Sequence, residues 1–441
     1  MVKKLKNNID TLSIAKKIIP SSSQTFSKSP HQLPQNDYTP NFVKKAKGAW
    51  IWDLDNNKYL DYLMALGPII LGYSDNDVNK FVNQTLKEGT IFSLNHYLEV
   101  DCAKLLTNTL DNTEMVKFGK TGSDANSAAI RLSRHITKKD IVLTCSYGGW
   151  HDWYVGKTSR KTGVPEQVSN LTKLFIRNDI DSFYSIINNY KDQVACVILE
   201  PFSFDNIQKD IIFLKEIRQI CSKNKIILIF DEVVSGFRYN LEGASKLSGV
   251  TPDLSTWGKA MANGFPLSCI TGKVKLMKEF DNIFFSGTFG GEALSLAACI
   301  ATINKLKEKK VINSLYEYNK KLSNLINKNI KDNNLNKYID LKSSGPRSII
   351  FFNSKNELLN RKRKTIMMQE FIKNKLLYFG INMPSYSHRG KEPHSDTWVG
   401  LITLGEGFHD VHHEQGNRKV LWHSLDIGGQ LIRMIDRNAK V

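Results

Sequence analysis

The sequence predicts an α/β protein with a large domain on a mainly parallel sheet and a small α+β domain built from both chain ends. From about residue 76 to 310, helical periodicity alternates with short apolar segments, a pattern typical of parallel strands joined by crossover helices. The 441 residues are enough to bury a large core and to form two or three domains.

The predicted elements fall into four regions along the chain. Residues 1–75 form an N-terminal segment and part of the small domain, and alternation around an Asn-rich turn predicts a hairpin between residues 49 and 62. Residues 76–310 form the large domain, with strands expected at 141–144, 195–199 and 226–230.

The remainder of the chain divides near residue 385. Residues 311–385 complete the small domain with a lysine-rich helix, a strand pair around 347–352 and a second helix ending at Phe379-Gly380. Residues 386–441 form an atypical tail that holds six of the ten histidines.

Composition narrows the class of protein. The net charge of +18 comes from lysines dispersed through helical stretches without interleaved aromatics, which favours a solvated surface over nucleic-acid binding. No run approaches the ~18 apolar residues of a membrane span, and no apolar signal core follows the basic N-terminus. The six cysteines show no CxxC spacing and read as reduced core thiols. We therefore expect a cytoplasmic protein with no nucleic-acid or membrane partner.

Two residues carry the most chemical information. The apolar strand 226–230 runs into Asp231, and Lys259 follows 28 residues later in a loop of small residues. A pyridoxal 5'-phosphate (PLP) site needs both groups, because a lysine amine holds the cofactor aldehyde as a Schiff base and a carboxylate keeps the pyridine nitrogen protonated. Either residue alone is more often a solvated surface group. Their order and the supporting motifs favour a PLP site.

Four further segments have the features of a cofactor site. Gly122 and Ser123 begin an amphipathic helix whose exposed N–H groups can cradle a phosphate, although a capped helix with nothing bound has the same pattern. Tyr147 follows a strand and can lie on a planar ring, whereas the nearby His151 is more simply explained as a hydrogen-bonded polar residue.

Glu200 and Asp231 close two successive apolar strands, and ligands of α/β sheets bind at such strand ends. The glycine-containing loop 286–291 offers the Thr288 hydroxyl and backbone amides as further phosphate contacts, and such a loop is weak evidence by itself.

Together these motifs resemble class-III aminotransferases of PLP fold type I, and most closely the glutamate-1-semialdehyde 2,1-aminomutases, over about residues 15–384. The resemblance rests on the following segments: Tyr59-Leu60-Asp61-Tyr62, Gly67-Pro68-Ile69-Ile70-Leu71-Gly72, Gly122-Ser123-Asp124-Ala125, Asp231-Glu232-Val233, Gly258-Lys259 and Ser286-Gly287-Thr288.

The resemblance implies a role for each matching residue. Lys259 is the catalytic Schiff-base lysine and Asp231 the partner of the pyridine nitrogen. Val233 and Tyr147 pack on the two faces of the cofactor ring. Gly122 and Ser123 hold the phosphate, together with Thr288 of the partner subunit in a homodimer. The implied substrates are a small-molecule amino donor and a carbonyl acceptor.

The chain departs from the aminomutase pattern mainly in groups that face the substrate. Gly148 stands where the family commonly has histidine, Gly122-Ser123-Asp124 where the aminomutase has Gly-Thr-Glu, Leu66 where it has tryptophan, and Lys28 where it has a loop arginine. The Gly-Ser-Asp variant resembles relatives that aminate carbonyl intermediates of surface-polysaccharide or amino-sugar metabolism. The expected activity is therefore aminomutase-like transamination. The alternatives are one of those aminotransferases, or a non-catalytic or metal-binding relative with a spoiled site.

The tail has a different resemblance. His409, His412 and His413 form an HxxHH box that resembles the last histidine box of membrane fatty-acid desaturases, where imidazoles help to bind a di-iron centre. The other boxes and the membrane helices of that family are missing from this chain. We expect no metal in the functional site, and we expect the tail to contribute no catalytic group.

Overall fold

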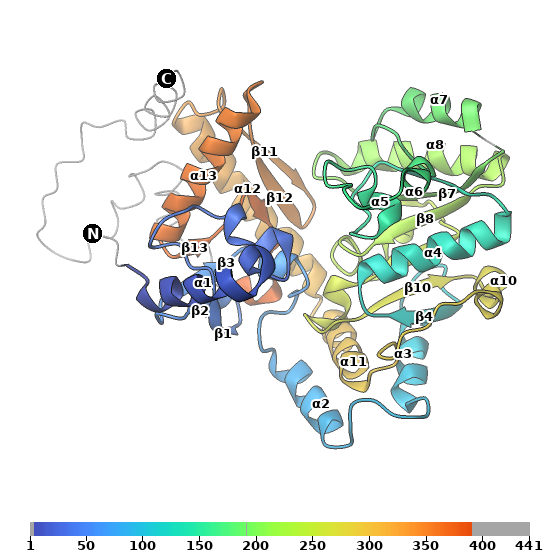
Figure 1. The fold of residues 1–441 in the computed structure, drawn as a ribbon, viewed down its shortest axis with the longest axis horizontal. Helices are drawn as coiled ribbons and strands as arrows, with labels where there is room; N and C mark the ends of the chain where they lie inside the picture. The colour runs from blue at the N-terminus through green and yellow to red at the C-terminus, as the bar shows by residue number, and fades with distance from the viewer. Residues whose placement is uncertain (1–3, 191, 390–441) are drawn as a thin grey trace, which may run out of the picture. The chain divides into compact units, whose positions relative to one another are not determined.

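The computed structural model describes residues 4–190 and 192–389, and contacts divide the chain into two compact units. Unit 1 takes residues 4–66, 72–74 and 314–389 of this part, and unit 2 takes residues 67–71 and 75–313. Figure 1 shows the elements of each unit. Within the described residues, no helix has the length and apolar character needed to cross a membrane.

Unit 2 is built on a seven-stranded sheet in the order β4-β10-β9-β8-β7-β5-β6. The strands β5 to β9 pair in parallel with one another, and β10 runs antiparallel to both of its neighbours, β4 and β9. The mainly parallel sheet predicted for this region is therefore confirmed. The strands are β4 (Met115–Gly119), β5 (Ile141–Thr144), β6 (Thr172–Leu174), β7 (Val194–Leu199), β8 (Ile227–Glu232), β9 (Leu254–Trp257) and β10 (Ser268–Gly272).

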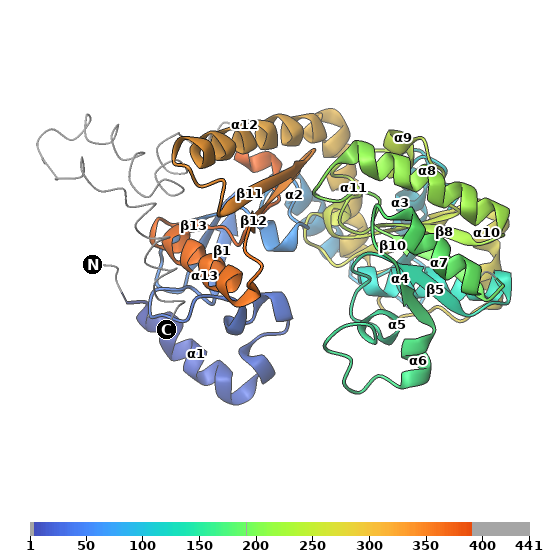
Figure 2. The same cartoon turned by 90° about the horizontal axis from the view of Figure 1, so that it is seen from above.

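Helices cover both faces of this sheet. Every residue of β7 and β8 is buried, as expected for central strands of a parallel sheet. Figure 2 shows α4 and α8 on opposite sides of these strands. The helices of unit 2 are α2 (Asn76–Leu86), α3 (Tyr97–Thr107), α4 (Gly122–Thr137), α5 (Asp152–Val155), α6 (Glu166–Asn170), α7 (Ile180–Tyr190), α8 (Ile207–Lys223), α9 (Ala244–Ser248), α10 (Val274–Met277) and α11 (Ala293–Glu308).

Unit 1 joins the two ends of the chain, as predicted for the small domain. The antiparallel pair β2 (Trp50–Asp53) and β3 (Lys58–Asp61) is the predicted hairpin, and β3 also pairs in parallel with β13 (Leu376–Leu377). The other strands and helices of this unit are β1 (Val43–Lys47), β11 (Ile339–Ser344), β12 (Arg347–Phe352), β14 (Ile381–Asn382), α1 (Lys6–Ile18), α12 (Val311–Asp332) and α13 (Glu357–Lys373).

The last predicted helix is shorter than expected. We placed its end at Phe379-Gly380, but α13 ends at Lys373, and Lys375 has a left-handed backbone with φ of 62°. The chain must leave the helix there because Leu376 and Leu377 pair with β3 and are buried. The gain from that strand pairing and burial outweighs the local helical pattern.

The start of the histidine-rich segment packs into unit 1. Tyr386–His388 form a short 3-10 helix, and the fully buried His388 ring lies 5.0 Å from the ring of Tyr62, centroid to centroid. Its Nδ1 accepts a hydrogen bond from the Ser385 N–H at 3.1 Å. His388 therefore belongs to the core of unit 1, whereas Tyr386 and Ser387 are half-buried. His409, His412 and His413 lie outside the described residues, as does the remainder of the predicted tail.

Candidate functional site

Asp231 lies at the carboxyl end of the central strand β8, where side chains of α/β proteins commonly meet a ligand. Its carboxylate is 6% exposed and accepts two hydrogen bonds, from Asn126 Nδ2 at 2.7 Å and from the Val233 N–H at 3.1 Å. Burial raises the pKa of Asp231 to about 6, while the two hydrogen bonds and the positive charge of Lys259 lower it. Asp231 is therefore mostly ionised at neutral pH, although little water reaches it.

The neighbouring Glu232 differs from Asp231 in its protonation state. Its side chain is 2% exposed, and burial raises the pKa of Glu232 to about 8. Its Oε1 accepts a hydrogen bond from the Ala244 N–H at 2.7 Å, and its Oε2 lies 3.5 Å from Ser235 Oγ. At pH 7 Glu232 is therefore mostly neutral, so that Asp231 carries the negative charge at this strand end.

Lys259 follows the next strand of the sheet. Strand β9 ends at Trp257, and the register of the parallel pair β8–β9 sets Asp231 opposite Thr256, three residues before the lysine. The lysine charge lowers the pKa of Asp231, so the two groups act on each other through space. Lys259 has a left-handed backbone with φ of 40°, which is uncommon outside glycine and often occurs at functional sites.

The first turn of α4 approaches the same strand ends. Thr121 caps this helix, because its Oγ1 accepts from the Asp124 N–H at 3.2 Å while Asp124 Oδ2 accepts from the Thr121 N–H at 2.7 Å. A Cβ on Gly122 would lie 2.6 Å from Val233 Cγ1, so only glycine allows this approach. Gly122 and Val233 are therefore in direct contact.

Ser123 connects α4 to the segment after β5. Its Oγ accepts a hydrogen bond from the Trp150 N–H at 3.2 Å. Gly149 has φ of +105°, and a Cβ there would lie 2.3 Å from Ser123 Oγ. Glycine at position 149 is thus required by its positive φ and by the close approach of Ser123.

Tyr147 and Glu200 lie at the ends of the adjacent strands β5 and β7. Ser146 Oγ accepts a hydrogen bond from the Glu200 N–H at 2.9 Å, which holds the two segments together. The Tyr147 ring is 69% exposed and meets the ring of Tyr154 edge-on, with centroids 5.4 Å apart. Glu200 raises the pKa of Asp231 through its charge, so it belongs to the same electrostatic environment.

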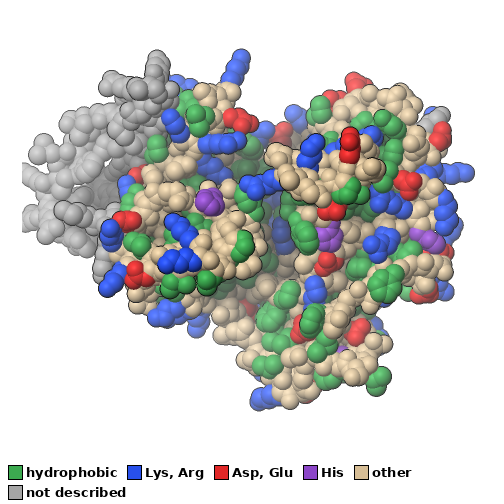
Figure 3. All heavy atoms as spheres, in the orientation of Figure 1, with side chains coloured by type: hydrophobic (Ala, Val, Ile, Leu, Met, Phe, Trp, Pro, Cys, Tyr) green, Lys and Arg blue, Asp and Glu red, His purple; other side chains and the backbone are tan. Residues whose placement is uncertain are grey.

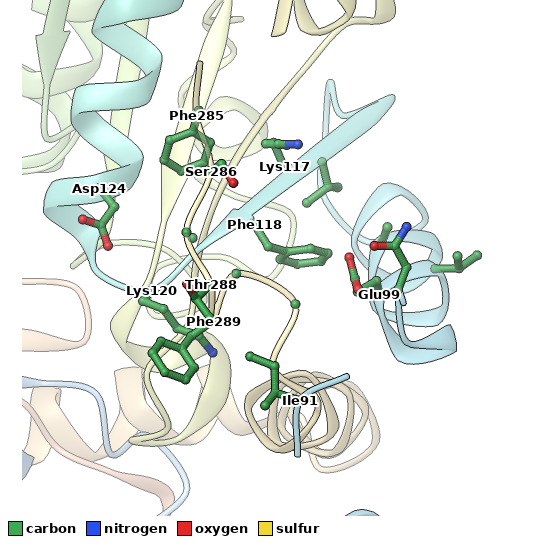
Figure 4. Close-up of a pocket in the computed structure, with 18 of the residues that line it drawn as sticks. Ile91, Glu99, Lys117, Phe118, Lys120, Asp124, Phe285, Ser286, Thr288 and Phe289 are labelled. Atoms are coloured by element: carbon green, nitrogen blue, oxygen red, sulfur yellow. The ribbon is translucent and has the colours of Figure 1, made fainter. Parts of the chain in front are cut away.

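The predicted site residue Thr288 borders a cavity. Its loop lines a cavity of about 920 Å³ with Lys120, Asp124 and Phe289, and the lining includes none of Gly122, Ser123 and Lys259. Figure 4 shows Thr288 and Phe289 beside Lys120 in this cavity. Lys120 is held there by an ion pair with Glu292 at 3.1 Å. Within one chain, Thr288 shares this cavity with Lys120 and Asp124, which flank the proposed phosphate cradle in sequence.

The structure also reveals partners to which the sequence assigned no role. Asn126 contacts Asp231 and accepts a hydrogen bond from Thr256 Oγ1 at 2.6 Å. The sequence could have indicated Asn126, because this residue lies one helical turn after Gly122 and therefore on the same face of the helix. His151 has a polar partner, as expected, because its Nδ1 lies 2.6 Å from Ser127 Oγ. Within residues 4–190 and 192–389, no cluster of His, Cys, Asp and Glu could hold a metal ion.

Comparison with known proteins identifies the class. The family described as aminotransferase class-III matches residues 33–361, and the chain belongs to this family. It is 36% identical to a 3-aminobutyryl-CoA aminotransferase of Cloacimonas acidaminovorans, over 70% of this chain and 75% of the relative. It is 37% identical to a glutamate-1-semialdehyde 2,1-aminomutase of Methanocaldococcus jannaschii, over 61% of this chain and 67% of the relative.

Solved structures share the fold. A transaminase with PLP bound aligns with a TM-score of 0.81 at 18% identity, covering 92% of this chain and 98% of that one. A β-phenylalanine aminotransferase from Variovorax paradoxus aligns with a TM-score of 0.80 at 19% identity, covering 92% and 95%. The protein is therefore a PLP-dependent enzyme of the aminotransferase type with the fold of type I transferases, and its family implies an amino donor and a carbonyl acceptor as substrates.

The residues present suit this cofactor. A buried carboxylate with a pKa of about 6 gains from a cationic partner such as a protonated pyridine nitrogen. The start of α4 offers N–H groups without partners inside the helix, next to the Ser123 hydroxyl. PLP supplies an aldehyde that takes up an amino group and a ring that accepts electrons from the bonds at the substrate's amino carbon.

Proposed function

We propose that the strand ends of unit 2 hold PLP through six residues. Lys259 would bind the aldehyde, Asp231 the ring nitrogen, and Gly122 and Ser123 the phosphate. Val233 and Tyr147 would lie against the two ring faces. The observation that carries this proposal is the buried Asp231, whose pKa the charge of Lys259 lowers, together with the contact of Val233 with Gly122 at the helix start.

Each side chain of this site would have a separate role in the reaction. An incoming amino group would displace the Lys259 amine, which then becomes a general base and acid close to the substrate carbon. Asp231 would stay ionised and keep the ring nitrogen protonated, while the neutral Glu232 adds no second charge. The exposed Tyr147 ring would cover the cofactor on the side away from Val233.

For the substrate, we infer an aminomutase-like transamination of glutamate-1-semialdehyde. In its support, the glutamate-1-semialdehyde aminomutase of Methanocaldococcus jannaschii is 37% identical. A second candidate, transfer of an amino group from a 3-aminoacyl thioester, has the support of the 3-aminobutyryl-CoA aminotransferase, which aligns over a larger share of this chain. One substitution weighs against glutamate-1-semialdehyde. Lys28, in the 3-10 turn Phe26–Lys28, stands where the aminomutase pattern has arginine, and lysine cannot form the bidentate contact that arginine makes with a carboxylate.

A half-reaction separates these substrates. Protein loaded with the amine form of the cofactor is mixed with glutamate-1-semialdehyde, with 3-oxobutyryl-CoA or with a keto sugar nucleotide. The near-visible absorbance of the aldehyde form is followed for each acceptor. We expect the return to be fastest with glutamate-1-semialdehyde. No response to that compound would remove the aminomutase assignment and leave the aminotransferase class intact.

We also propose that the enzyme works as a homodimer, in which Thr288 reaches the cofactor phosphate of the other subunit. Large apolar side chains are exposed on unit 2 beside the Thr288 cavity, among them Leu94 at 84% and Phe289 at 59%. Figure 3 shows hydrophobic side chains gathered below α4, on the side where α2 and α3 lie. Exposed apolar patches of this kind mark interaction sites. This surface supports the dimer because a second copy would cover it.

Light scattering tests the dimer. Wild-type protein is expected at twice the chain mass, and Leu94→Lys is expected to lower that mass and weaken cofactor binding together. A monomeric wild-type protein with full affinity for PLP would rule out the shared site. Leu247→Lys serves as the matched control, because Leu247 is also exposed but does not line the cavity.

A further inference from the structure

Three buried polar side chains, Thr256, Asn126 and Asp231, form a hydrogen-bonded chain in the core of unit 2. Thr256 on β9 is fully buried, and its Oγ1 donates a hydrogen bond of 2.6 Å to Asn126 Oδ1. Asn126 on α4 is 2% exposed, and its Nδ2 donates to Asp231 Oδ2 at 2.7 Å. Three elements that are distant in sequence therefore meet at one amide.

The contacts around Asn126 fix the direction of these hydrogen bonds. Its Nδ2 faces two acceptors, Asp231 Oδ2 and the Gly148 carbonyl oxygen, the latter at 3.3 Å. The amide nitrogen must point toward them, so Oδ1 points toward Thr256, whose hydroxyl has to be the donor. A flipped amide would leave the Gly148 carbonyl without this hydrogen bond and bring the Asn126 oxygen against a carboxylate.

The charges that face Asp231 come from several elements. Glu200 at the end of β7 and Glu232 on the same strand carry or can carry negative charge, and Lys259 after β9 is positive. Burial is the largest influence and raises the pKa of Asp231, and the hydrogen bond from Asn126 is the largest influence that lowers it. The amide thus opposes burial more than the lysine charge does.

We propose that Asn126, oriented by Thr256, is a positioning residue that keeps the Asp231 carboxylate ionised and aimed at the cofactor. This inference rests on the proposed role of Asp231 as the partner of the ring nitrogen. Asn126 would not touch the reacting atoms, and it acts on the cofactor only through Asp231.

Removing the amide has a consequence that depends on pH. Without the hydrogen bond, Asp231 takes up a proton at higher pH, and a protonated carboxyl cannot pair with a cationic ring nitrogen. Loss of one hydrogen bond to the charged carboxylate should raise the pKa of Asp231 by about one unit. At a pH below both the original and the raised pKa, this lowers the affinity for the cofactor roughly tenfold. At high pH Asp231 ionises again, and the affinity returns.

The test measures the affinity of the full-length apoprotein for PLP between pH 6 and pH 9.5, from the absorbance of the bound cofactor. Asn126→Leu preserves the shape of the side chain and removes its polar atoms. We expect its affinity to fall about fivefold at pH 6 and about twofold at pH 7, and to match that of the wild type near pH 9. Thr256→Val is the milder variant, and we expect a smaller shift in the same direction.

Controls separate this inference from the function on which it rests. Ser133→Ala lies on the same helix, is fully buried and loses a hydrogen bond to Ala129, so it reports a general defect of α4. Its pH profile should match that of the wild type. Asp231→Asn is expected to bind PLP weakly at every pH, and full affinity in this variant would overturn the proposed cofactor site itself.

Two results would overturn the positioning role alone. One is an Asn126→Leu affinity equal to that of the wild type across the pH range while Asp231→Asn is defective. The other is a loss that is the same at every pH, which indicates a structural defect. If Asn126→Leu does not fold, Thr256→Val decides the question by the same two criteria.

Discussion

Glu232→Gln offers the sharpest test of the charge states in the core of unit 2. The pKa of Glu232 is about 8 in the folded protein against an ordinary value of 4.5, because the side chain is buried. Glutamine has the same shape, its oxygen can accept from the Ala244 N–H, and its amide nitrogen can donate to Ser235 Oγ. The variant therefore reproduces the neutral form of Glu232 and cannot ionise.

The sign and size of the effect follow from proton linkage. Because the folded pKa is raised, stability associated with the protonated side chain is fully present below pH 4.5 and is lost as the pH rises to about 8. Each pH unit in that window corresponds to about 1.4 kcal/mol, so the wild type loses up to ~5 kcal/mol that the variant keeps. For a unit of this size, that difference corresponds to roughly 10 °C in melting temperature.

Thermal melting of the apoprotein at pH 5 and at pH 8.5 is the assay. The two proteins should melt within about 1 °C of each other at pH 5, and the variant should melt about 5–10 °C higher at pH 8.5. Glu242→Gln is the matched control, because Glu242 is a half-exposed carboxylate on the following loop and should show no gap that grows with pH. A Gln variant that is less stable at pH 8.5, or a gap that does not change with pH, would refute a neutral Glu232.

The other expectations concern single side chains. Lys259→Ala should fold but lack the near-visible absorbance of the bound cofactor, and an unchanged spectrum would exclude Lys259 as its attachment point. Gly122→Val should lower cofactor affinity and cost about 1–3 kcal/mol, because its Cβ would overlap Val233, and equal melting curves would contradict this contact. His388→Ala should destabilise the protein by about 2–4 kcal/mol by leaving a cavity beside Tyr62, and denaturant unfolding with no shift in midpoint would show that the ring is dispensable.

Much of the fold and part of the site could be predicted because their signals are local. Apolar strands that end in Glu200 and Asp231, and small residues before Lys259, can be recognised in the sequence and predict at which ends of the strands the candidate site lies. The hairpin between residues 49 and 62 was predictable for the same reason.

Other features depend on contacts between distant segments. Asn126 and Asp231 are 105 residues apart, and only the packing of α4 on the sheet brings them together. The neutral state of Glu232 depends on complete burial, which an acidic residue in a sequence does not reveal. The end of α13 at Lys373 depends on the pairing of Leu376 with Leu60, at the other end of the chain.

The left-handed backbone at Lys259 has a practical consequence for preparing an inactive enzyme. Any side chain at this position keeps the strain that φ of 40° imposes, and alanine retains it just as lysine does. Glycine relieves it, and at a positive φ this relief exceeds the cost of the greater freedom of the unfolded chain. An inactive form for trapping bound substrates is therefore better made with glycine than with alanine. Lys259 therefore occupies a position at which the backbone is strained for any residue other than glycine.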